Sequence, residues 1–453
     1  MEYYKYMEAE NPNQKLAPEQ IPDQNLTSPP IANQRGNFLL ALGIVLLILI
    51  VGVGIYFLEL NKNKSNNNQN NTTVIAPTNI QIENVVNSSN RIAYMLNGDL
   101  WTINADGLGE KQLTQYGYNE SLVWSPDTSK IAYKSSPQSV VNKGKTYADC
   151  TDYHNIWIIN TDGSEPVQIT NSEASRSEPS WSPDGTKIVF IENDKLIIYD
   201  LVSKSKKTLA NNAYYDKDPN QCRIAGGGGT SNASWNPKDN TILYNPQRDT
   251  DSEVQLISAE DGKVLKTIDS FGQWSPDGTK IAYVEYGKSE PVTQAIAVLT
   301  VNDGKKEIYK PFMDNANSLY WSPDGKELLY HSLEDSALGS PPLKMNTVHV
   351  LTLASRTDRN ISDKVLRRFI EQRKDSGMQV GESSTYGWSS DGRFIIVDVN
   401  TEEHRPEYAS VNQINIVDAK TGDFIKTIKE ARRTNSNVSD GNGYYNGIAW
   451  SPK

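Results

Sequence analysis

Two close pairs of acidic side chains could do chemistry, Asp149 with Asp152 and Asp249 with Asp251. Two carboxylates at one site supply the acid and the base or nucleophile of glycoside-cleaving enzymes. The same pairs are also typical of a solvated loop, so an enzyme (a lyase or hydrolase) remains the alternative hypothesis. The chain contains neither a Gly-x-Ser-x-Gly nor a His-Glu-x-x-His motif. Its 4 histidines show no ligand spacing: His154, His331, His349 and His404. We therefore predict no catalytic residue and no cofactor.

Two further patterns could shape a site in loops. Asp216, Asp218 and Asn220 place oxygen ligands at alternate positions, as at the start of a calcium loop. The glycine and the distal glutamate of such a loop are missing, so a polar loop is the preferred interpretation and calcium the weaker one. Cys150 and Cys222 are the only cysteines. In an exported protein such a pair predicts a disulfide, with two free thiols as the alternative.

Aromatic and basic residues recur in the predicted loops. Tyrosine and arginine are over-represented in binding hot spots, although a single one is more often a loop-packing residue. As a group they are the candidate partner-binding residues: Tyr147, Tyr153, Tyr214, Tyr215, Arg248, Arg405, Tyr408, Tyr444 and Tyr445.

A repeated phrase, Trp-Ser-Pro-Asp-Gly, determines which elements must position these residues. Full copies begin at Trp181, Trp274 and Trp321, and each runs into an apolar segment such as Ile281-Ala282-Tyr283. Ser-Pro-Asp-Gly suits a type I turn followed by a left-handed residue, and the flanking residues suit strands. Each phrase therefore predicts a hairpin. The copies lie roughly 40 to 70 residues apart, which is propeller spacing. The complete set of phrase tryptophans is Trp124, Trp181, Trp235, Trp274, Trp321, Trp388 and Trp450.

The first strand and the last phrase each lack the other half of a hairpin. The strand that begins at Arg91 has no phrase before it, and Trp450 has no strand after it. A ring resolves both facts if the segment ending at Trp450 is the innermost strand of the blade that begins at Arg91. We therefore predict an all-β, seven-bladed propeller over residues 88–453, closed by N- and C-terminal strands of one blade.

The phrase resembles the repeat of TolB-type, WD-repeat-like β-propellers, also present in the propeller domains of prolyl oligopeptidases and dipeptidyl peptidases. The resemblance covers the propeller only, and it implies an exported domain. We expect this chain to carry neither the hydrolase domain of the peptidases nor the N-terminal α/β domain of TolB-type proteins. Some copies depart from the phrase: Thr128 and Asp239 replace the glycine, Ser390 the proline, and Asn236 and Lys238 alter the fourth copy. Because Thr128 is β-branched, we expect its turn to differ.

Strand order predicts two unlike faces. The turns within the phrases, and turns such as Asn302-Asp303-Gly304, are short and fall on one face. Long connections fall on the opposite face, at about 136–154, 211–230, 332–345, 362–383, 399–411 and 429–445. Within 362–377 the stripe Val365, Leu366, Phe369 and Ile370 predicts a helix, with Ser362 as its N-cap and Gly377 as its terminator. Its basic residues are either a solvated surface or a docking site for an acidic partner.

The N-terminal part predicts a membrane anchor. Residues 1–37 are proline-rich and aperiodic, which predicts a disordered tail. Phe38 to Leu58 contains no charge and is long enough for a transmembrane helix. Residues 59–87 predict an Asn-rich linker. A cleavable signal peptide is the rival interpretation for the apolar run.

Arg35 and the pair Lys62 and Lys64 give no clear orientation. From the resemblance we place the N-terminus in the cytoplasm and the propeller outside the cell membrane. The net charge of −10 argues against a nucleic-acid partner. We therefore expect a single-pass receptor or scaffold that binds a protein or glycan through its long-loop face. A purely structural surface protein is a third hypothesis.

Overall fold

The structure, a computed structural model, describes residues 90–115, 119–136, 154–171, 177–192, 195–211, 232–246, 254–286, 294–313, 317–336, 343–373, 378–403, 409–434 and 447–452. These residues belong to the larger of two compact units, Asn79–Lys453. The predicted tail 1–37, membrane helix 38–58 and linker 59–87 lie outside them. Within the described ranges, no helix has the length and apolar character needed to cross a bilayer.

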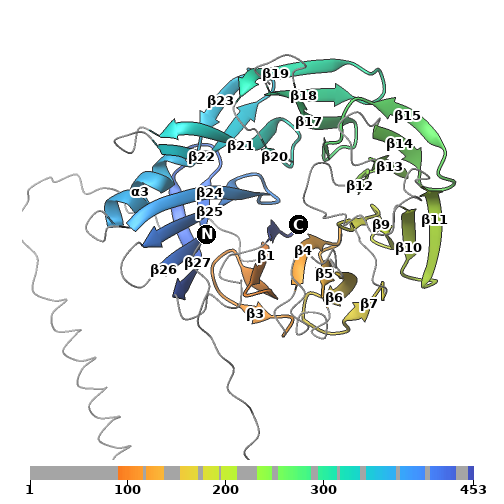
Figure 1. The fold of residues 1–453 in the computed structure, drawn as a ribbon, viewed down its shortest axis with the longest axis horizontal. Coiled ribbons are helices and arrows are strands. Elements are labelled where there is room, and N and C mark those ends of the chain that lie inside the picture. Colours follow the sequence, from red (N-terminus) through yellow and green to blue (C-terminus); the bar gives the residue numbers. More distant parts are fainter. Residues whose placement is uncertain are drawn as a thin grey trace, which may run out of the picture. The chain divides into compact units, whose positions relative to one another are not determined.

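Seven four-stranded antiparallel sheets follow one another around a ring (Figure 1), which confirms the predicted all-β, seven-bladed propeller. We number the sheets as blades and give their strands from the innermost outward. Blade 1 comprises β28 (Ile448–Trp450), β1 (Arg91–Leu96), β2 (Asp99–Asn104) and β3 (Lys111–Gln112). Blade 2 comprises β4 (Asn119–Trp124), β5 (Lys130–Ser135), β6 (Asn155–Asn160) and β7 (Val167–Gln168). Blade 3 comprises β8 (Ser180–Trp181), β9 (Lys187–Glu192), β10 (Lys195–Asp200) and β11 (Ser205–Asn211). Blade 4 comprises β12 (Ala233–Trp235), β13 (Thr241–Tyr244), β14 (Val254–Ser258) and β15 (Val264–Ile268).

The other three blades follow the same order. Blade 5 comprises β16 (Gln273–Trp274), β17 (Lys280–Tyr286), β18 (Gln294–Thr300) and β19 (Lys306–Met313). Blade 6 comprises β20 (Asn317–Trp321), β21 (Glu327–Ser336), β22 (Leu343–Thr352) and β23 (Thr357–Asn360). Blade 7 comprises β24 (Met378–Trp388), β25 (Phe394–Glu403), β26 (Ala409–Asp418) and β27 (Phe424–Thr434). The phrase tryptophan is therefore the last residue of every innermost strand.

The two ends of the propeller meet in blade 1. Strand β28 pairs antiparallel with β1, with Ile92 opposite Trp450 and Tyr94 opposite Ile448. Tyr94 and Trp450 then pack against Ile396 of blade 7 in one buried cluster. The ring is therefore closed as predicted.

A repeated hydrogen-bond pattern explains why the phrase contains serine and aspartate. The Ser182 hydroxyl donates to Asp184 Oδ1 (2.6 Å), which also accepts the Thr186 N–H (3.0 Å). Ser182 Oγ in turn accepts the N–H of Lys187 (2.9 Å). The serine hydroxyl hydrogen bond stabilises the ionised carboxylate, and the pKa of Asp184 falls to about 2. The same serine–aspartate bond recurs at Ser125–Asp127, Ser275–Asp277, Ser322–Asp324 and Ser389–Asp391.

The turn at Thr128 is not different from the others, and our expectation was wrong. Thr128 adopts a left-handed φ of 62°, close to the 67° of Gly185. Its N–H donates to the Ser125 carbonyl (2.9 Å), as that of Gly185 does to Ser182. The surrounding hydrogen bonds therefore hold a β-branched residue in a conformation that it disfavours.

Hydrogen bonds from the phrase tryptophans join the innermost strands of neighbouring blades. The Trp181 indole N–H donates to the Val123 carbonyl (3.1 Å), one residue before the tryptophan of the preceding blade. The indoles of Trp124, Trp274, Trp321 and Trp388 donate to the equivalent carbonyls, those of Ala449, Ser234, Gln273 and Tyr320. These five phrase tryptophans therefore both fill the core and link adjacent blades.

The predicted helix is present as α3 (Asp363–Arg373), between β23 and β24. Val365, Leu366 and Phe369 are fully buried in the cluster between blades 6 and 7. The N-terminal cap comes from Asn360, whose Oδ1 accepts the N–H groups of Ser362 and Asp363 (both 3.1 Å), and not from the Ser362 side chain.

Four segments that we expected to be loops are partly strand. Strand β21 continues to Ser336, β25 continues to Glu403 and β27 continues to Thr434, and β24 begins at Met378. The first three sequences lack the alternation of a half-buried strand, which is why they resembled loops. Pairing supplies the structure, since ten residues of β21 pair with β22 from Glu327–Thr352 to Ser336–Leu343.

Candidate functional site

The residues that we expected to form the binding face lie outside the described residues. This applies to the nine tyrosines and arginines, to Cys150 and Cys222, to Asp216, Asp218 and Asn220, and to both aspartate pairs. The structure neither brings these residues together nor separates them. What it describes of that face is the set of strand ends that lead into it.

These strand ends form a raised wall over blades 6 and 7. Strands β21, β22, β25 and β26 have 10 residues each, whereas β5 and β9 have 6. In blades 2, 3, 5, 6 and 7 the second strand starts two residues after the left-handed turn residue, as Lys187 does after Gly185 and Glu327 after Gly325. The additional four residues therefore project at the long-loop end, by about 13 Å at ~3.3 Å per residue. Blades 6 and 7 are neighbours, so the wall is continuous across two blades.

On the opposite, short-turn face, a basic side chain of one blade recurrently donates to a carbonyl of the next. Lys266 of β15 donates to the Val301 carbonyl (2.7 Å), and Lys426 of β27 donates to the Asp106 carbonyl. Arg359 of β23 contacts the Ala419 carbonyl (3.4 Å), and Lys207 of β11 the Glu260 carbonyl. These contacts tie the outer strands of blades 3, 4, 6 and 7 to the next blade.

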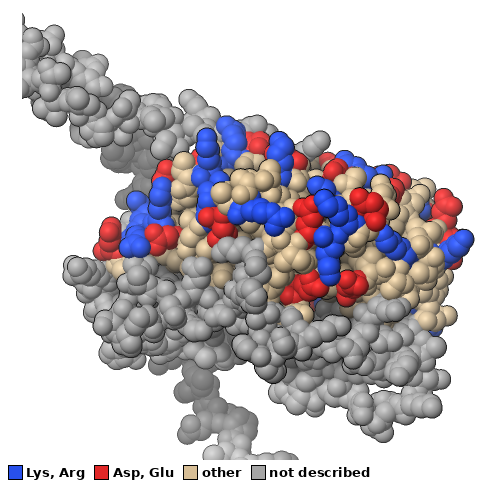
Figure 2. All heavy atoms as spheres, turned by 90° about the horizontal axis from the view of Figure 1, so that it is seen from above, with Lys and Arg blue, Asp and Glu red and all other residues tan. Residues whose placement is uncertain are grey.

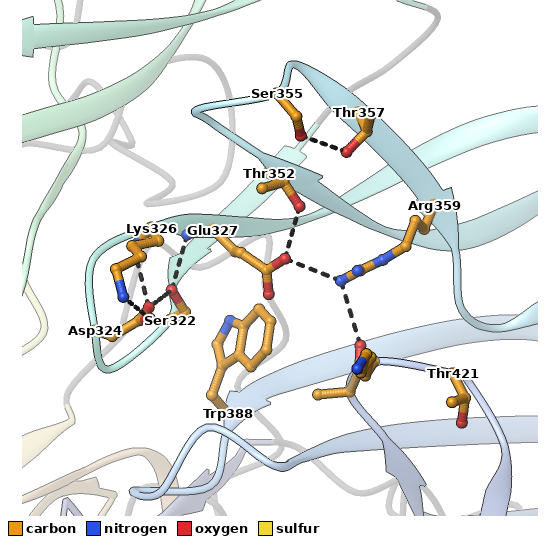
Figure 3. A network of polar contacts seen from close by, with 12 residues as sticks. Ser322, Asp324, Lys326, Glu327, Thr352, Ser355, Thr357, Arg359, Trp388 and Thr421 are labelled. Atoms are coloured by element: carbon orange, nitrogen blue, oxygen red, sulfur yellow. Dashed lines mark hydrogen bonds and ion pairs between the residues drawn. The ribbon is translucent and has the colours of Figure 1, made fainter.

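Figure 3 shows how the junction between blades 6 and 7 is filled. Glu327 Oε1 accepts hydrogen bonds from the Thr352 hydroxyl (2.7 Å) and from Arg359 Nη2 (3.1 Å). In the figure the carboxylate of Glu327 lies beside the ring of Trp388, and Arg359 reaches toward blade 7. The side chains of one blade thus close the space over the next tryptophan.

The equivalent junction between blades 3 and 4 is open. Strand register shows which residues are equivalent. Lys187 pairs with Asp200 as Glu327 pairs with Thr352. Lys207 pairs with the residue two before Asp200, as Arg359 pairs with the residue two before Thr352. Lys187 Nζ lies 3.7 Å from Asp200 Oδ2, beyond hydrogen-bond distance. Lys207 crosses the junction to the Glu260 carbonyl as Arg359 does to Ala419, but a lysine stands at the position of Glu327, and a cavity of about 460 Å³ remains among the described residues.

We call this cavity the Trp235 cleft. Its floor is formed by three buried residues: Ile198, Trp235 and Ala259. Its rim is formed by six polar residues: Lys187, Asp200, Ser205, Lys207, Asn240 and Glu260. Every one of the nine lies in the described part of blades 3 and 4.

Trp235 departs from the pattern of the five tryptophans whose indoles donate to the preceding blade; Trp450 departs too, since its indole N–H has no hydrogen-bond partner among the described residues. Its indole N–H donates to the carbonyl of Asp239 in its own turn (3.2 Å) and not to the preceding blade. Asp239 stands where glycine is usual, and it is not among the residues with positive φ. Its carbonyl is therefore available to Trp235. The backbone N–H of Trp235 still donates to Ser180 Oγ (3.0 Å), so blades 3 and 4 remain in contact.

The charges of the rim balance. Lys187 and Lys207 are cationic, and Asp200 and Glu260 are anionic. Asp200 Oδ1 accepts the N–H groups of Ser203 (2.8 Å) and Val202 (3.0 Å), and the Ser203 bond is the main cause of its lowered pKa. The Asn240 amide and the Glu260 carboxylate make no hydrogen bond or ion pair to other described residues. The cleft therefore offers both donors and acceptors to a ligand.

Two buried polar groups elsewhere were not expected from the sequence. His349 Nδ1 lies 2.9 Å from Asp358 Oδ2, and His349 Nε2 lies 3.1 Å from Thr347 Oγ1. This order of hydroxyl, imidazole and carboxylate matches a hydrolase triad. However, Thr347 is only 7% exposed and its hydroxyl donates to the Ser332 carbonyl (3.0 Å), so the oxygen is inside the core. The contact depends on the pairing of β22 with β23, which the sequence alone did not show.

The second group is Asp398 of β25. Its Oδ1 is buried and has no hydrogen-bond partner among the described residues. Burial raises the pKa of Asp398 to about 7. No group of three or more histidine, cysteine, aspartate or glutamate residues within the described ranges is placed to hold a metal ion.

Comparisons with known proteins give relatives of the propeller. No family model matches the chain. An uncharacterized protein of Agrobacterium fabrum is 26% identical over 197 residues, 42% of this chain and 47% of that protein. Dipeptidyl-peptidase 5 of Porphyromonas gingivalis is 22% identical over 291 residues, 52% of this chain and 41% of that protein. The chain thus spans less than half the length of these curated relatives.

Similar solved structures include TolB from Acinetobacter baumannii, with 22% identity and a TM-score of 0.42 over 60% of this chain and 63% of that one. An oligogalacturonate lyase in complex with manganese has 16% identity and a TM-score of 0.45 over 66% of this chain and 79% of that one. At these identities the similarity concerns the fold alone.

Proposed function

We propose that this chain is a TolB-type propeller held outside the cytoplasm by a membrane helix at 38–58 and the linker 59–87. In this proposal it binds a protein or glycan through its long-loop face and catalyses no reaction. The observation that carries the proposal is the raised wall of blades 6 and 7. Long strands form only where they are paired and buried, and the other blades complete the ring with shorter second and third strands.

The wall suits binding because it is rigid. The β25–β26 ladder runs without a break from Phe394–Asp418 to Glu403–Ala409. At the base of the wall, Val397 and Val399 are fully buried against the helix residues Val365 and Phe369. Loops carried on such a scaffold can present a fixed surface to a partner. In the sequence, the predicted residues Arg405 and Tyr408 stand between β25 and β26.

Charge is consistent with a protein or glycan partner. In the rim view of Figure 2, lysine and arginine side chains alternate with aspartate and glutamate over the described surface. A nucleic-acid partner would favour a continuous basic surface instead. The net charge of the chain is −10.

Photocrosslinking in the native cell tests the proposal. A photoreactive residue at Tyr215, Tyr408 or Tyr445 is expected to give an adduct with one protein or glycan. The matched control is the same residue at Thr279, an exposed position on the short-turn face. Equal adducts at Thr279, or none at the three tyrosines, would contradict binding through the long-loop face.

Membrane topology is tested separately. A protease added to intact cells, or to spheroplasts where an outer layer excludes it, is expected to digest the propeller and to spare a tag at the N-terminus. Protection of the propeller in both preparations would contradict its placement outside the cytoplasm.

A further inference from the structure

We propose that the Trp235 cleft is a second binding site, and that it takes a neutral saccharide of one or two sugar units. The cleft lies on the short-turn face, at the opposite end of the blades from the long-loop face. It therefore does not depend on the function proposed above. The chemistry of its floor and rim defines the ligand.

The size and floor of the cleft suit a sugar ring. Its volume of about 460 Å³ falls within the ~300–1,000 Å³ range of small-molecule sites. A pyranose has an apolar face of C–H groups that packs on apolar surface. Ile198, Ala259 and Trp235 line the cleft and supply such a surface.

The rim suits hydroxyl groups. Each sugar hydroxyl both donates and accepts a hydrogen bond, so it needs both kinds of partner. Lys187 and Lys207 donate, Glu260 accepts, and the Asn240 amide does both. Because the two lysines are balanced by Asp200 and Glu260, the rim has no net charge to attract an anion or a cation.

The cleft is a specific departure from the repeat. Between blades 6 and 7 the same three backbone positions hold Glu327, Thr352 and Arg359, which fill the junction. Blade 4 also carries the one phrase whose turn sequence is altered at Asn236, Lys238 and Asp239. Both changes act at one junction: one removes the filling side chains, and the other redirects the Trp235 indole.

The repeat itself supplies the variant that tests the site. Lys187→Glu, Asp200→Thr and Lys207→Arg together install the side chains of the filled junction. Ala259 already matches Ala419, the residue whose carbonyl Arg359 contacts. The charge-matched control is Lys204→Asn, which removes one positive charge from an exposed turn with a left-handed φ of 54°. Lys187→Met is a second cleft variant with a minimal change of shape.

The measurement is saturation-transfer NMR and calorimetry on the full chain in lipid nanodiscs, which avoid glycosidic detergents. The probes are cellobiose, maltose and N,N′-diacetylchitobiose. At least one is expected to bind the wild-type chain and the Lys204→Asn variant equally. The filled-junction variant is expected to lose at least about tenfold in affinity, and Lys187→Met to lose about threefold to tenfold. The Kd is expected to change less than about twofold between 50 and 500 mM salt.

Three results would overturn the proposal. The first is that none of the three probes binds the wild-type chain. The second is equal binding to the wild-type chain and to a folded filled-junction variant. The third is binding that falls steeply with salt, which would indicate a charged ligand. If the triple variant does not fold, unchanged binding to Lys187→Met would have the same meaning.

Discussion

Thr128 offers a sharp test of how the repeated turn works. Four other phrases place Gly185, Gly278, Gly325 and Gly392 at this position, with φ between 67° and 71°, and Thr128 adopts 62°. The left-handed conformation costs a residue with a Cβ about 1–2 kcal/mol. Glycine removes that cost but gains about 0.5–1 kcal/mol of unfolded-state freedom. The substitution Thr128→Gly is therefore expected to raise the free energy of unfolding by about 0.5–1 kcal/mol.

The reverse substitution gives a matched control. A Cβ at Gly185 would lie 3.7 Å from its nearest neighbour, Pro126 Cδ, so space is available. Gly185→Thr is expected to lower the free energy of unfolding by about the same 0.5–1 kcal/mol. At Gly278 a Cβ would lie 2.2 Å from Asn236 Oδ1. Gly278→Thr therefore adds a clash and is expected to cost at least about 2 kcal/mol.

Urea unfolding of the full chain, followed by tryptophan fluorescence, measures all three variants. The reasoning is refuted if Thr128→Gly is less stable than the wild type, or if the costs at Gly185 and Gly278 are equal. The first result would mean that the threonine side chain contributes more than its backbone strain costs. The second would mean that contacts across the blade junction do not limit the turn.

Three further outcomes follow from the polar groups. Hydrogen bonds to Asp184 lower its pKa to about 2, so their contribution to stability is complete above the unfolded pKa near 4 and is lost as pH falls toward 2. Asp184→Asn is therefore expected to flatten the acid side of the stability–pH curve, and an unchanged acid side would contradict this. Burial raises the pKa of Asp398 to about 7, so stability falls as pH rises from about 4 to 7. The free energy of unfolding of Asp398→Asn is expected to equal that of the wild type near pH 4 and to exceed it at pH 8 by up to about 4 kcal/mol. Equal stability of the two proteins at both pH values would count against a buried carboxyl. Glu327→Gln is expected to lower the free energy of unfolding by about 1 kcal/mol at low salt and by less at high salt, since the ion pair with Arg359 is partly exposed. Lys187→Gln is the control and is expected to have little effect. A larger loss of stability in Lys187→Gln would argue against the open junction.

The repeat made most of the fold predictable. A phrase with turn residues at fixed positions determines a hairpin, and the mismatch between Arg91 and Trp450 determines the closure of the ring. The exceptions arose where neighbours outweigh local preference. Thr128 keeps the common turn because Ser125 and Asp127 hold it on both sides. The strand ends at Ser336 and Glu403 form because their partners in β22 and β26 are long.

The Trp235 cleft was less accessible from the sequence. The altered phrase at Asn236, Lys238 and Asp239 was visible, and it marks the correct blade. The side chains that face it, Lys187 and Lys207, come from another blade, and only the strand register shows that they replace Glu327 and Arg359. Which side chains meet between blades is a property of the assembled ring.

The central claim is that the raised wall binds the partner, and trimming the wall tests it most directly. Val399 pairs with Gln413, so replacing residues 400–412 by Asn-Gly gives the hairpin a two-residue turn. The control is Lys420→Ala, in the short turn at the other end of β26. The measurement is the affinity of the crosslinked partner for the full chain and for both variants. The account predicts a loss of at least about tenfold on trimming, or about 1.4 kcal/mol, with the control unchanged. Equal affinity for the trimmed and full-length walls would contradict it.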